Sequence, residues 1–533
     1  MTNVGPNINM ILSVRDFPQW ELPSTLNWYE DPFHSKTWQM KFLSCYWIPF
    51  LSARDIEQGK RYWQSFFSCN TYPNRSKTMA YHDHICSMRI EAVLLTIFGL
   101  ASEDQGVLPS WHDLLTRDPD FFYELLYQLL VDAGVVDYYL RSGKFVLHNH
   151  NLIMARALLT FSSCYGETPI ATQYRHTAFR VFVSHMRAIF ESDGFIREQS
   201  SQYHHSFLYY FFKIYCQLRR DSLTPQWLLD EMQCLLQRLI SVDALLCPPD
   251  GKVVHMGDTG MIEIRNALVS LDGQLAKVGM SVGVPVFEQL PRVSFLRESG
   301  LCIFRNPQLG RFLFVDLSPV KKVHGHKDLG SWQYFSKGKR WVEDVGGPYK
   351  YGSKEDRMLA SSESHTLLSP VGQGQMAGRA YGVELKECEF GWILSFKTNV
   401  YGSRYEHTKT FLVLRDISGF SVRDAFEGPE AMEYCGRVMC SAGVDPREVD
   451  ASRKGLYRLE KESESIDLEI SGDGLTSVSN AVSASSWTVN RMDMVNSIQY
   501  RLTPPGKSVQ SVVNIYEETD AKEKLKAFHK QRQ

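Results

Sequence analysis

The sequence has no excess of charge of either sign. Its 58 lysines and arginines are matched by 60 aspartates and glutamates, which gives a formal net charge of −2. A chain so balanced has no global attraction for nucleic acid or for an anionic membrane, so any polyanion must be bound by a local patch. We therefore predict no nucleic-acid partner.

Paired cysteines, long apolar runs and a leader segment are also missing. None of the 11 cysteines forms a CxxC pair, which argues against a disulfide framework and a thiolate zinc site. No stretch reaches the roughly 18 apolar residues that a membrane span needs. Residues 1–20 lack the basic and apolar regions of a signal peptide. We therefore expect reduced thiols, no membrane span and a cytoplasmic protein, with a periplasmic or secreted location left open.

The chain changes in texture near residue 285. Before this point, apolar residues recur three and four positions apart, which predicts helices in the segments 84–100, 121–140, 149–164, 174–191 and 224–241. Short turns join them, as in a bundle or a ring of helical hairpins. From Val293 onward, short β-branched and aromatic runs broken by glycine predict antiparallel strands in a sandwich. We predict a helical domain over residues 1–285 and an all-β domain over residues 286–533.

A histidine pair opens the most suggestive segment of the second half. His324, His326 and Asp328 alternate and would share one face of a strand, with Asp344 and His365 further along the chain. Two histidines and a carboxylate form a possible zinc site, with water or substrate as the fourth ligand. The alternative is a polar sheet face that binds no metal.

Two further candidates stand at the starts of predicted helices. Asn149 begins one helix and Tyr203 begins another. Each has a structural alternative, because Asn149 fits a helix cap and Tyr203 fits a packed aromatic residue. The chain has no nucleophile elbow, Walker loop or dinucleotide fingerprint. Asparagine, tyrosine and histidine without a nucleophile favour proton transfer over covalent catalysis.

Taken in order, these segments resemble the heparinase II/III-like polysaccharide lyases. The resemblance is carried by Asn149-His150, by Asp193-Gly194 with Glu198-Gln199-Ser200 and Tyr203-His204, and by His324-Gly325-His326-Lys327-Asp328 with Gly338, Asp344-Val345-Gly346, Arg357 and His365-Thr366. The segment Tyr81-His82-Asp83-His84 with Arg89 resembles relatives from surface-polysaccharide gene clusters. The family fold is an incomplete (α/α) toroid followed by an antiparallel β-sandwich, which implies an α+β multidomain chain.

The resemblance implies a lyase that cleaves beside a uronic acid by β-elimination. It assigns catalysis to Asn149, His150, Tyr203 and His324. It assigns substrate binding to Arg89, His148, Gln199, His204 and Arg357. It makes His326, Asp344 and His365 the ligands of a structural zinc that holds the sandwich loop against the toroid. The expected partner is an acidic polysaccharide or oligosaccharide.

Three questions stay open at this level. The same cleft would serve a non-catalytic glycan-binding protein of capsule, O-antigen or exopolysaccharide biosynthesis. A hydrolase is a weaker alternative, because Glu198 and Asp328 show no paired-carboxylate spacing. The oligomeric state is undetermined, with a homodimer as one option.

Overall fold

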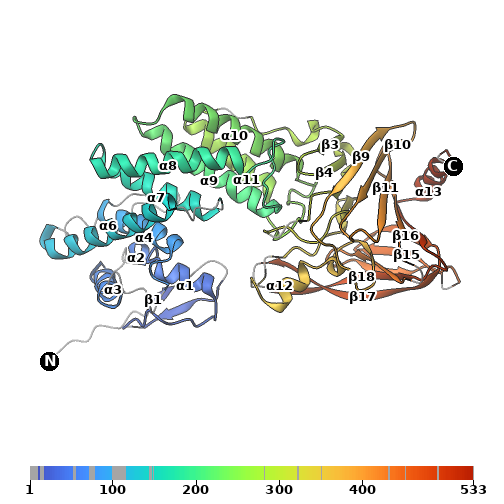
Figure 1. The fold of residues 1–533 in the computed structure, drawn as a ribbon, viewed down its shortest axis with the longest axis horizontal. Coiled ribbons are helices and arrows are strands. Elements are labelled where there is room, and N and C mark those ends of the chain that lie inside the picture. Colours follow the sequence, from blue (N-terminus) through green and yellow to red (C-terminus); the bar gives the residue numbers. More distant parts are fainter. Residues whose placement is uncertain are drawn as a thin grey trace. The chain divides into compact units, whose positions relative to one another are not determined.

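Helices precede strands along the chain in the computed structural model (Figure 1). The structure describes residues 1–533 except 1–9, 13–16, 24, 52–55, 71–78, 99–115, 143–146, 148, 281–282, 321–322, 348, 350, 430–431, 451, 489–490 and 532–533. The chain divides into two compact units. The helical unit comprises residues 1–189 and 213–229, and the sheet unit comprises residues 190–212 and 230–533.

The helical unit contains a short hairpin and a series of helices. The hairpin pairs β1 (Met10–Leu12) with β2 (Trp20–Leu22). The helices are α1 (Lys36–Leu43), α2 (Ile48–Leu51), α3 (Ile56–Cys69), α4 (Asp83–Phe98), α6 (Pro119–Arg141), α7 (Asn149–Tyr165) and α8 (Pro169–Ala188). Two more helices, α9 (Ser201–Arg220) and α10 (Gln226–Leu245), have residues in both units. The helices predicted from periodicity are therefore confirmed, with small shifts at their ends.

Local signals explain where these helices begin. Asp118 caps α6 by accepting a hydrogen bond from the backbone N–H of Phe121, and Pro119 follows at the first helical position. Proline fits there because its missing N–H would have no partner inside the helix. Pro169 starts α8 in the same way.

None of the described helices is long and apolar enough to cross a membrane.

Three antiparallel sheets form most of the sheet unit. The five-stranded sheet has the order β3 (Val293–Leu296), β4 (Leu301–Asn306), β5 (Arg311–Asp316), β6 (Trp332–Ser336) and β7 (Lys339–Val342). The eight-stranded sheet has the order β14 (Asp445–Glu448), β15 (Leu456–Lys461), β16 (Glu464–Gly472), β19 (Ser508–Tyr516), β12 (Gly419–Glu427), β11 (Glu406–Leu414), β10 (Gly391–Thr398) and β9 (Ala380–Glu387). The four-stranded sheet has the order β17 (Leu475–Thr488), β18 (Arg491–Leu502), β13 (Tyr434–Met439) and β8 (Leu368–Pro370).

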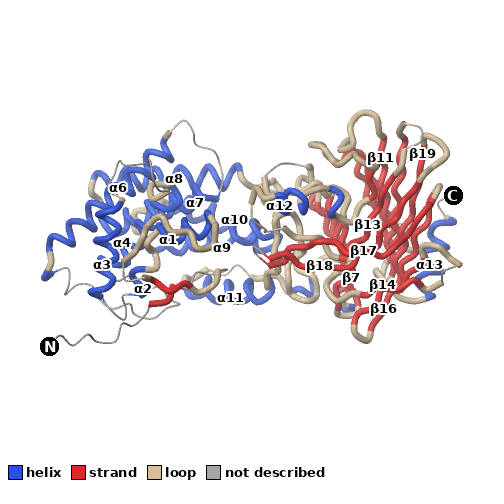
Figure 2. The backbone as a smooth tube through the Cα atoms, turned by 90° about the horizontal axis from the view of Figure 1, so that it is seen from below, coloured by secondary structure: helices blue, strands red, loops and turns tan. Residues whose placement is uncertain are grey.

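The sheets lie in layers and share one hydrophobic core (Figure 2). Trp332 and Tyr334 on β6 pack against Phe420 on β12, with ring centroids 5.2 and 5.0 Å apart. Buried residues alternate with more exposed ones along β16 and β19, as expected of a sandwich, whereas β4 and β6 are buried on both faces. The predicted change from helices to antiparallel sheets is confirmed. The boundary near residue 285 stays a prediction; α11 (Ile264–Lys277) precedes it and β3 follows it.

Candidate active site and metal cluster

Tyr203 lies in the first turn of α9, where a serine organises the backbone. The Ser200 hydroxyl accepts a hydrogen bond from the N–H of Tyr203 at 3.3 Å and donates one to the carbonyl of Asp258 at 2.9 Å. The start of α9 is thus fastened to the segment that carries Asp258. All three residues belong to the sheet unit.

A glycine allows three backbone segments to meet beside Tyr203. Gly257 has a φ of +57°, and a Cβ atom there would lie 2.2 Å from the carbonyl oxygen of His324 and 2.4 Å from that of Gln199. The N–H of Asp258 donates to the same carbonyl of His324 at 2.9 Å. Since only glycine fits this contact, Gly257 sets how closely the His324 segment approaches α9.

The segment 323–328 is a loop and not the predicted strand. A Cβ atom on Gly325 would lie 2.7 Å from Oε1 of Gln199, so the chain passes too close to its neighbour for a regular ladder. The N–H of Lys327 donates to the carbonyl of Ala360, which lies outside any strand. The alternation argument was wrong about the local structure, although both histidines reach a common carboxylate.

Asp258 is that carboxylate, and it joins the two histidines. Its Oδ2 lies 2.9 Å from Nδ1 of His324, and its Oδ1 lies 3.1 Å from Nε2 of His326. The His324 ring stacks on the Tyr203 ring with centroids 3.6 Å apart. Nε2 of His324 lies 3.9 Å from Oε2 of Glu198, too far for a hydrogen bond. His324 is therefore oriented on one side and open on the other.

The Tyr203 hydroxyl is held as a protonated group. Its oxygen lies 3.1 Å from the hydroxyl oxygen of Tyr351. Burial raises the pKa of Tyr203 to about 12; the bond to Tyr351 works against this, while the charges of Asp258 and Glu198 add to it. Tyr203 and His324 are only partly buried, so a ligand can reach them.

Four buried residues form a separate cluster that could hold a metal ion. Ligand atoms of His326, Asp328, Asp344 and His365 all lie within 4.8 Å of one another. Their exposures are 4%, 4%, 2% and 0%, so the cluster is shielded from solvent. Nδ1 of His365 lies 2.9 Å from Oδ2 of Asp344. We call these four residues the loop cluster.

The unpartnered atoms of the loop cluster fit a cation. Nδ1 of His326 and Nε2 of His365 are buried and make no hydrogen bond with any described residue. Unpaired buried polar atoms are costly, and two of them facing two carboxylates suit a divalent ion. Nε2 of His326 bonds Asp258, a carboxylate outside the cluster, as the second nitrogen of a metal-binding histidine commonly does, and Nδ1 of His365 bonds Asp344 within the cluster.

The charges of the loop cluster are coupled. Burial raises the pKa of Asp328, and the neighbouring Asp344 adds to this, while His365 opposes it. Burial also raises the pKa of Asp344, but His365 outweighs it and leaves that pKa below its usual value. Burial lowers the pKa of His365, but Asp344 outweighs it and leaves that pKa raised.

Arg89 has a place in the core of the helical unit and not at a binding surface. It is 0% exposed and forms an ion pair with Asp132, its NH2 lying 2.6 Å from Oδ1. Nη1 donates to the carbonyl of Leu43, and the Nη2 that pairs with Asp132 also donates to the carbonyl of Ala80. A fully buried guanidinium cannot contact a polysaccharide, so the substrate-binding role predicted for Arg89 is corrected to a structural one.

Two other predicted binding residues are also buried. His204 is 0% exposed, and its Nε2 lies 3.2 Å from the carbonyl of Leu239. Burial, the largest influence on it, lowers the pKa of His204. Gln199 is 5% exposed, and its Nε2 donates to the carbonyl of Pro319 at 2.6 Å. Both residues fasten the loops around the site, which corrects the substrate-contact role for His204.

The remaining predicted binding residues differ in what the structure shows. Arg357 is exposed on α12 (Lys354–Leu359), and its NH1 donates to the carbonyl of Gly352 at 2.8 Å. The guanidinium is thus available on the same segment as Tyr351. His148 lies outside the described residues.

Asn149 and His150 begin α7 in the helical unit, as predicted. The His150 ring lies 4.6 Å from that of His84 and 6.3 Å from that of His82. Asp83 pairs with His82 at 2.6 Å, and burial raises the pKa of Asp83 less than this partner lowers it. The prediction that Asn149 and His150 act together with Tyr203 and His324 stays a prediction.

Sequence reasoning missed three residues around the site. Asp258 and Tyr351 were not considered, and Asp328 was placed beside the histidines without a role as ligand. Nothing near Asp258 in the chain signals its contacts, since it lies 66 residues from His324. The only local sign is the turn that contains Gly257.

Part of the chain matches a known family. Residues 288–510 match the family model described as Heparinase II/III-like, C-terminal. The chain therefore carries a heparinase II/III-like C-terminal domain, which confirms the resemblance drawn from the motifs. No curated protein sequence matches the chain.

Solved structures share the fold of the whole chain. A structure titled heparinase III has a TM-score of 0.77 at 14% identity and covers 93% of this chain and 80% of its own. A heparan sulfate lyase mutant from Pedobacter heparinus has a TM-score of 0.67 at 16% identity and covers 95% and 81%. This similarity confirms the predicted fold, an incomplete (α/α) toroid followed by an antiparallel β-sandwich.

Proposed function

We propose that this protein is a polysaccharide lyase that cleaves a uronic-acid-containing glycan by β-elimination. The observation that carries the proposal is the partly exposed pair of Tyr203 and His324, whose stacked rings have centroids 3.6 Å apart. The pair offers a proton donor beside an oriented imidazole. The family match of residues 288–510 supports the same class of reaction.

The reaction needs two proton transfers and one neutralised charge. The C5 proton of a uronate is weakly acidic because the adjacent carboxylate resists a second negative charge. Hydrogen-bond donors aimed at that carboxylate lower the barrier, as they do for other developing anions. We assign this task to Asn149, as the family resemblance implies, with Arg357 as a second donor.

Tyr203 is the proposed acid. Because its pKa is raised to about 12, its hydroxyl keeps its proton at neutral pH and can give it to the leaving oxygen. The hydroxyl of Tyr351 lies 3.1 Å away and can donate a hydrogen bond to the Tyr203 oxygen, which takes a proton back from solvent afterwards. Tyr203 would also serve as base if proton and leaving group lie on the same side of the sugar ring.

His324 is the proposed base, with His150 as the alternative. A carboxylate only accepts hydrogen bonds, so Nδ1 of His324 carries the proton that Asp258 accepts. In the neutral ring this makes Nε2 the hydrogen-bond acceptor, open to a substrate. The arrangement follows the general rule that a carboxylate orients a catalytic imidazole.

The loop cluster would hold a divalent metal ion, for which zinc is our proposal. When bound, such an ion supplies positive charge that offsets the two buried carboxylates, Asp328 and Asp344. His326 links the cluster to Asp258, and Asp258 positions His324. Hydrogen bonds through Asp258 thus connect His326 of the loop cluster to His324, the proposed base.

Elimination is tested by the near-ultraviolet absorbance of the unsaturated uronate that it leaves. The substrates are alginate, heparan sulfate, hyaluronan, chondroitin and bacterial capsule extracts. We expect Tyr203→Phe to lower the rate about 10²- to 10⁴-fold, the usual range for a lost acid or base. Tyr138→Phe, which removes an exposed hydroxyl on α6, is the matched control and should keep full activity.

Two results would contradict the proposal. One is no absorbance rise on any of these glycans with the wild-type protein. The other is a Tyr203→Phe variant as fast as wild type. The first result favours a protein that binds a glycan without cleaving it, and the second removes Tyr203 as the acid.

A further inference from the structure

A polar cavity lies at one end of the eight-stranded sheet, apart from all residues assigned above. Its volume is about 1040 Å³, large enough for a small ligand. Tyr381, Thr398, Glu406, Glu427 and Ser508 line it from the ends of five neighbouring strands. We call it the strand-end cavity.

Hydrogen bonds hold one wall of this cavity in place. Asn399 lies in the loop between β10 and β11, and its Oδ1 accepts from the N–H of Arg379 at 2.8 Å. The carbonyl of the next residue, Val400, accepts from the N–H of Met376 at 2.7 Å. Val400 is also fully buried in the core. The loop is therefore preformed, which lowers the entropic cost of binding.

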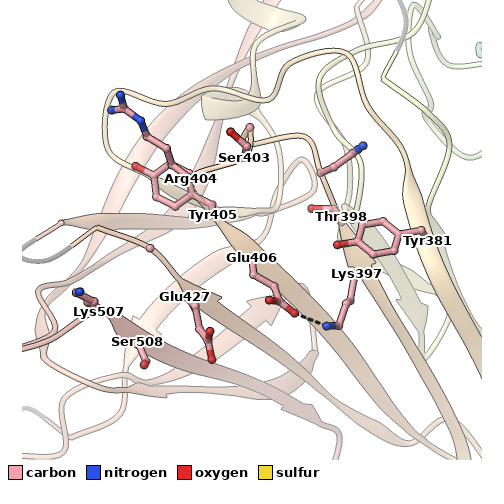
Figure 3. Close-up of a pocket in the computed structure, with 13 residues that line it drawn as sticks. Tyr381, Lys397, Thr398, Ser403, Arg404, Tyr405, Glu406, Glu427, Lys507 and Ser508 are labelled. Carbon is pink, nitrogen blue, oxygen red and sulfur yellow. Dashed lines mark hydrogen bonds and ion pairs between the residues drawn. The ribbon is translucent and has the colours of Figure 1, made fainter.

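Aromatic rings and an ion pair shape the interior. In the view of Figure 3, Tyr381 and Tyr405 lie on either side of the ion pair between Lys397 and Glu406. Tyr381 is 43% exposed, so its ring is open to a ligand. Two tyrosines with hydroxyl groups around them suit a sugar, whose ring packs on an aromatic face while its hydroxyls form hydrogen bonds.

The charged side chains of the cavity indicate which class of sugar it would bind. Lys397, Arg404 and Lys507 are basic, and Glu406 and Glu427 are acidic. Glu406 and Glu427 would repel a heavily sulfated chain but accept hydrogen bonds from sugar hydroxyls. Arg404 lines the cavity, and no ion pair joins it to a described residue, so its guanidinium is available to bind a carboxylate.

We propose that the strand-end cavity is a second binding site for an unsulfated, uronate-containing glycan. The ligand class rests on the proposed function, and the site itself goes beyond it, because it holds the glycan without cleaving it. Both this cavity and Tyr203 belong to the sheet unit. A polymer bound at two sites gains affinity that a short oligosaccharide cannot gain.

The test measures binding by calorimetry in the Tyr203→Phe background, so that cleavage of the probes is slow compared with the measurement. The probes are alginate and hyaluronan as unsulfated polymers, and heparin as a sulfated one. We expect Arg404→Ala to weaken binding of an unsulfated polymer about tenfold, the loss of one charge-assisted hydrogen bond. Tyr405→Ala should weaken it further, and heparin affinity should change less.

Arg447→Ala is the matched control, since Arg447 is an exposed arginine on β14 of the same sheet. Equal affinity in Arg404→Ala and Arg447→Ala would overturn the second site, as would the absence of binding by both unsulfated polymers. The lyase assay separates the two proposals. Cleavage with no effect of Arg404→Ala removes only the second site, and Arg404-dependent binding without cleavage removes only the lyase.

Discussion

The sheet unit contains two buried histidine–aspartate clusters, which differ in what balances the charge of their carboxylates. In the strand cluster, which we define as His407, Lys409 and Asp424, Nε2 of His407 lies 2.8 Å and Nζ of Lys409 lies 3.2 Å from Oδ1 of Asp424. Nδ1 of His407 lies 3.1 Å from the hydroxyl of Thr398. Both ring nitrogens are partnered, and a lysine balances the carboxylate.

The loop cluster has no such cation among the described residues. Neither Asp328 nor Asp344 pairs with a described lysine or arginine, and His326 and His365 each keep one unpartnered ring nitrogen. A buried carboxylate needs compensation in either case. The strand cluster therefore has its buried carboxylate balanced by a lysine of the chain itself, whereas the loop cluster could hold a metal ion in the corresponding role.

Metal content is the largest expected difference between the clusters. Protein never exposed to chelator should contain zinc, and His365→Ala should lose it along with a large part of the thermal stability, because metal binding and folding are coupled. Elemental analysis and a thermal melt measure both. His407→Ala is the matched control and should keep its metal; equal metal in the two variants, or none in wild type, would contradict the assignment.

Removing the lysine should damage the strand cluster next most strongly. Lys409→Met leaves Asp424 buried at 2% exposure with only His407 beside it. Breaking a buried pair from one side costs about 3–5 kcal/mol of unfolding free energy. Urea unfolding should show this loss with no change in metal content. Adding Asp424→Asn should restore part of the stability, and a double variant as unstable as Lys409→Met would speak against the charge explanation.

The close contact of Gly257 with the His324 and Gln199 segments should make protein stability more sensitive to an added methyl group there than in an open turn. Gly257→Ala places a Cβ atom against two carbonyl oxygens, whereas Gly338→Ala, at a φ of +72°, meets no atom within 4 Å. Both variants pay about 1–2 kcal/mol for the left-handed backbone. We expect an additional loss of stability, and of lyase activity, only in Gly257→Ala. Equal stability of the two variants in urea would show that the close contact is not essential.

The smallest effect is a pH dependence of the strand cluster. Burial lowers the pKa of His407 more than Asp424 raises it. The folded pKa is below the unfolded value of about 6.5, so His407 contributes full stability above pH 6.5 and this is lost as the pH falls below it. The slope is at most about 1.4 kcal/mol per pH unit. His407→Gln should flatten the slope measured by urea unfolding at mildly acidic pH.

The two clusters also differ in how far they could be predicted. Three residues of the loop cluster, His326, Asp344 and His365, were predicted together because they match the motifs of the family that the chain resembles. Asp258 was not predicted because it belongs to a turn that lies far along the chain from the histidines that it contacts. The strand cluster was not predicted, since Lys409 and Asp424 look like ordinary strand residues until β11 and β12 pair them.

Arg89 and His204 show the opposite error. Their residue types suggested contact with an acidic ligand, but both are 0% exposed. Burial depends on how helices pack, and the residue type does not reveal whether an arginine faces solvent or a core carboxylate such as Asp132. The motif resemblance therefore located the right segments and assigned some side chains the wrong surroundings.

The sequence by itself determined the order of helices and strands and the family of the second half, and through the family resemblance it singled out three residues of the loop cluster. These depend on periodicity and on residues close together in the chain, which local sterics and hydrogen bonding control. Only the tertiary structure decided that Tyr203 stacks on His324, that Asp258 joins two histidines and that Arg89 is a core residue. Each of these depends on contacts between distant segments, where packing and desolvation outweigh local preference.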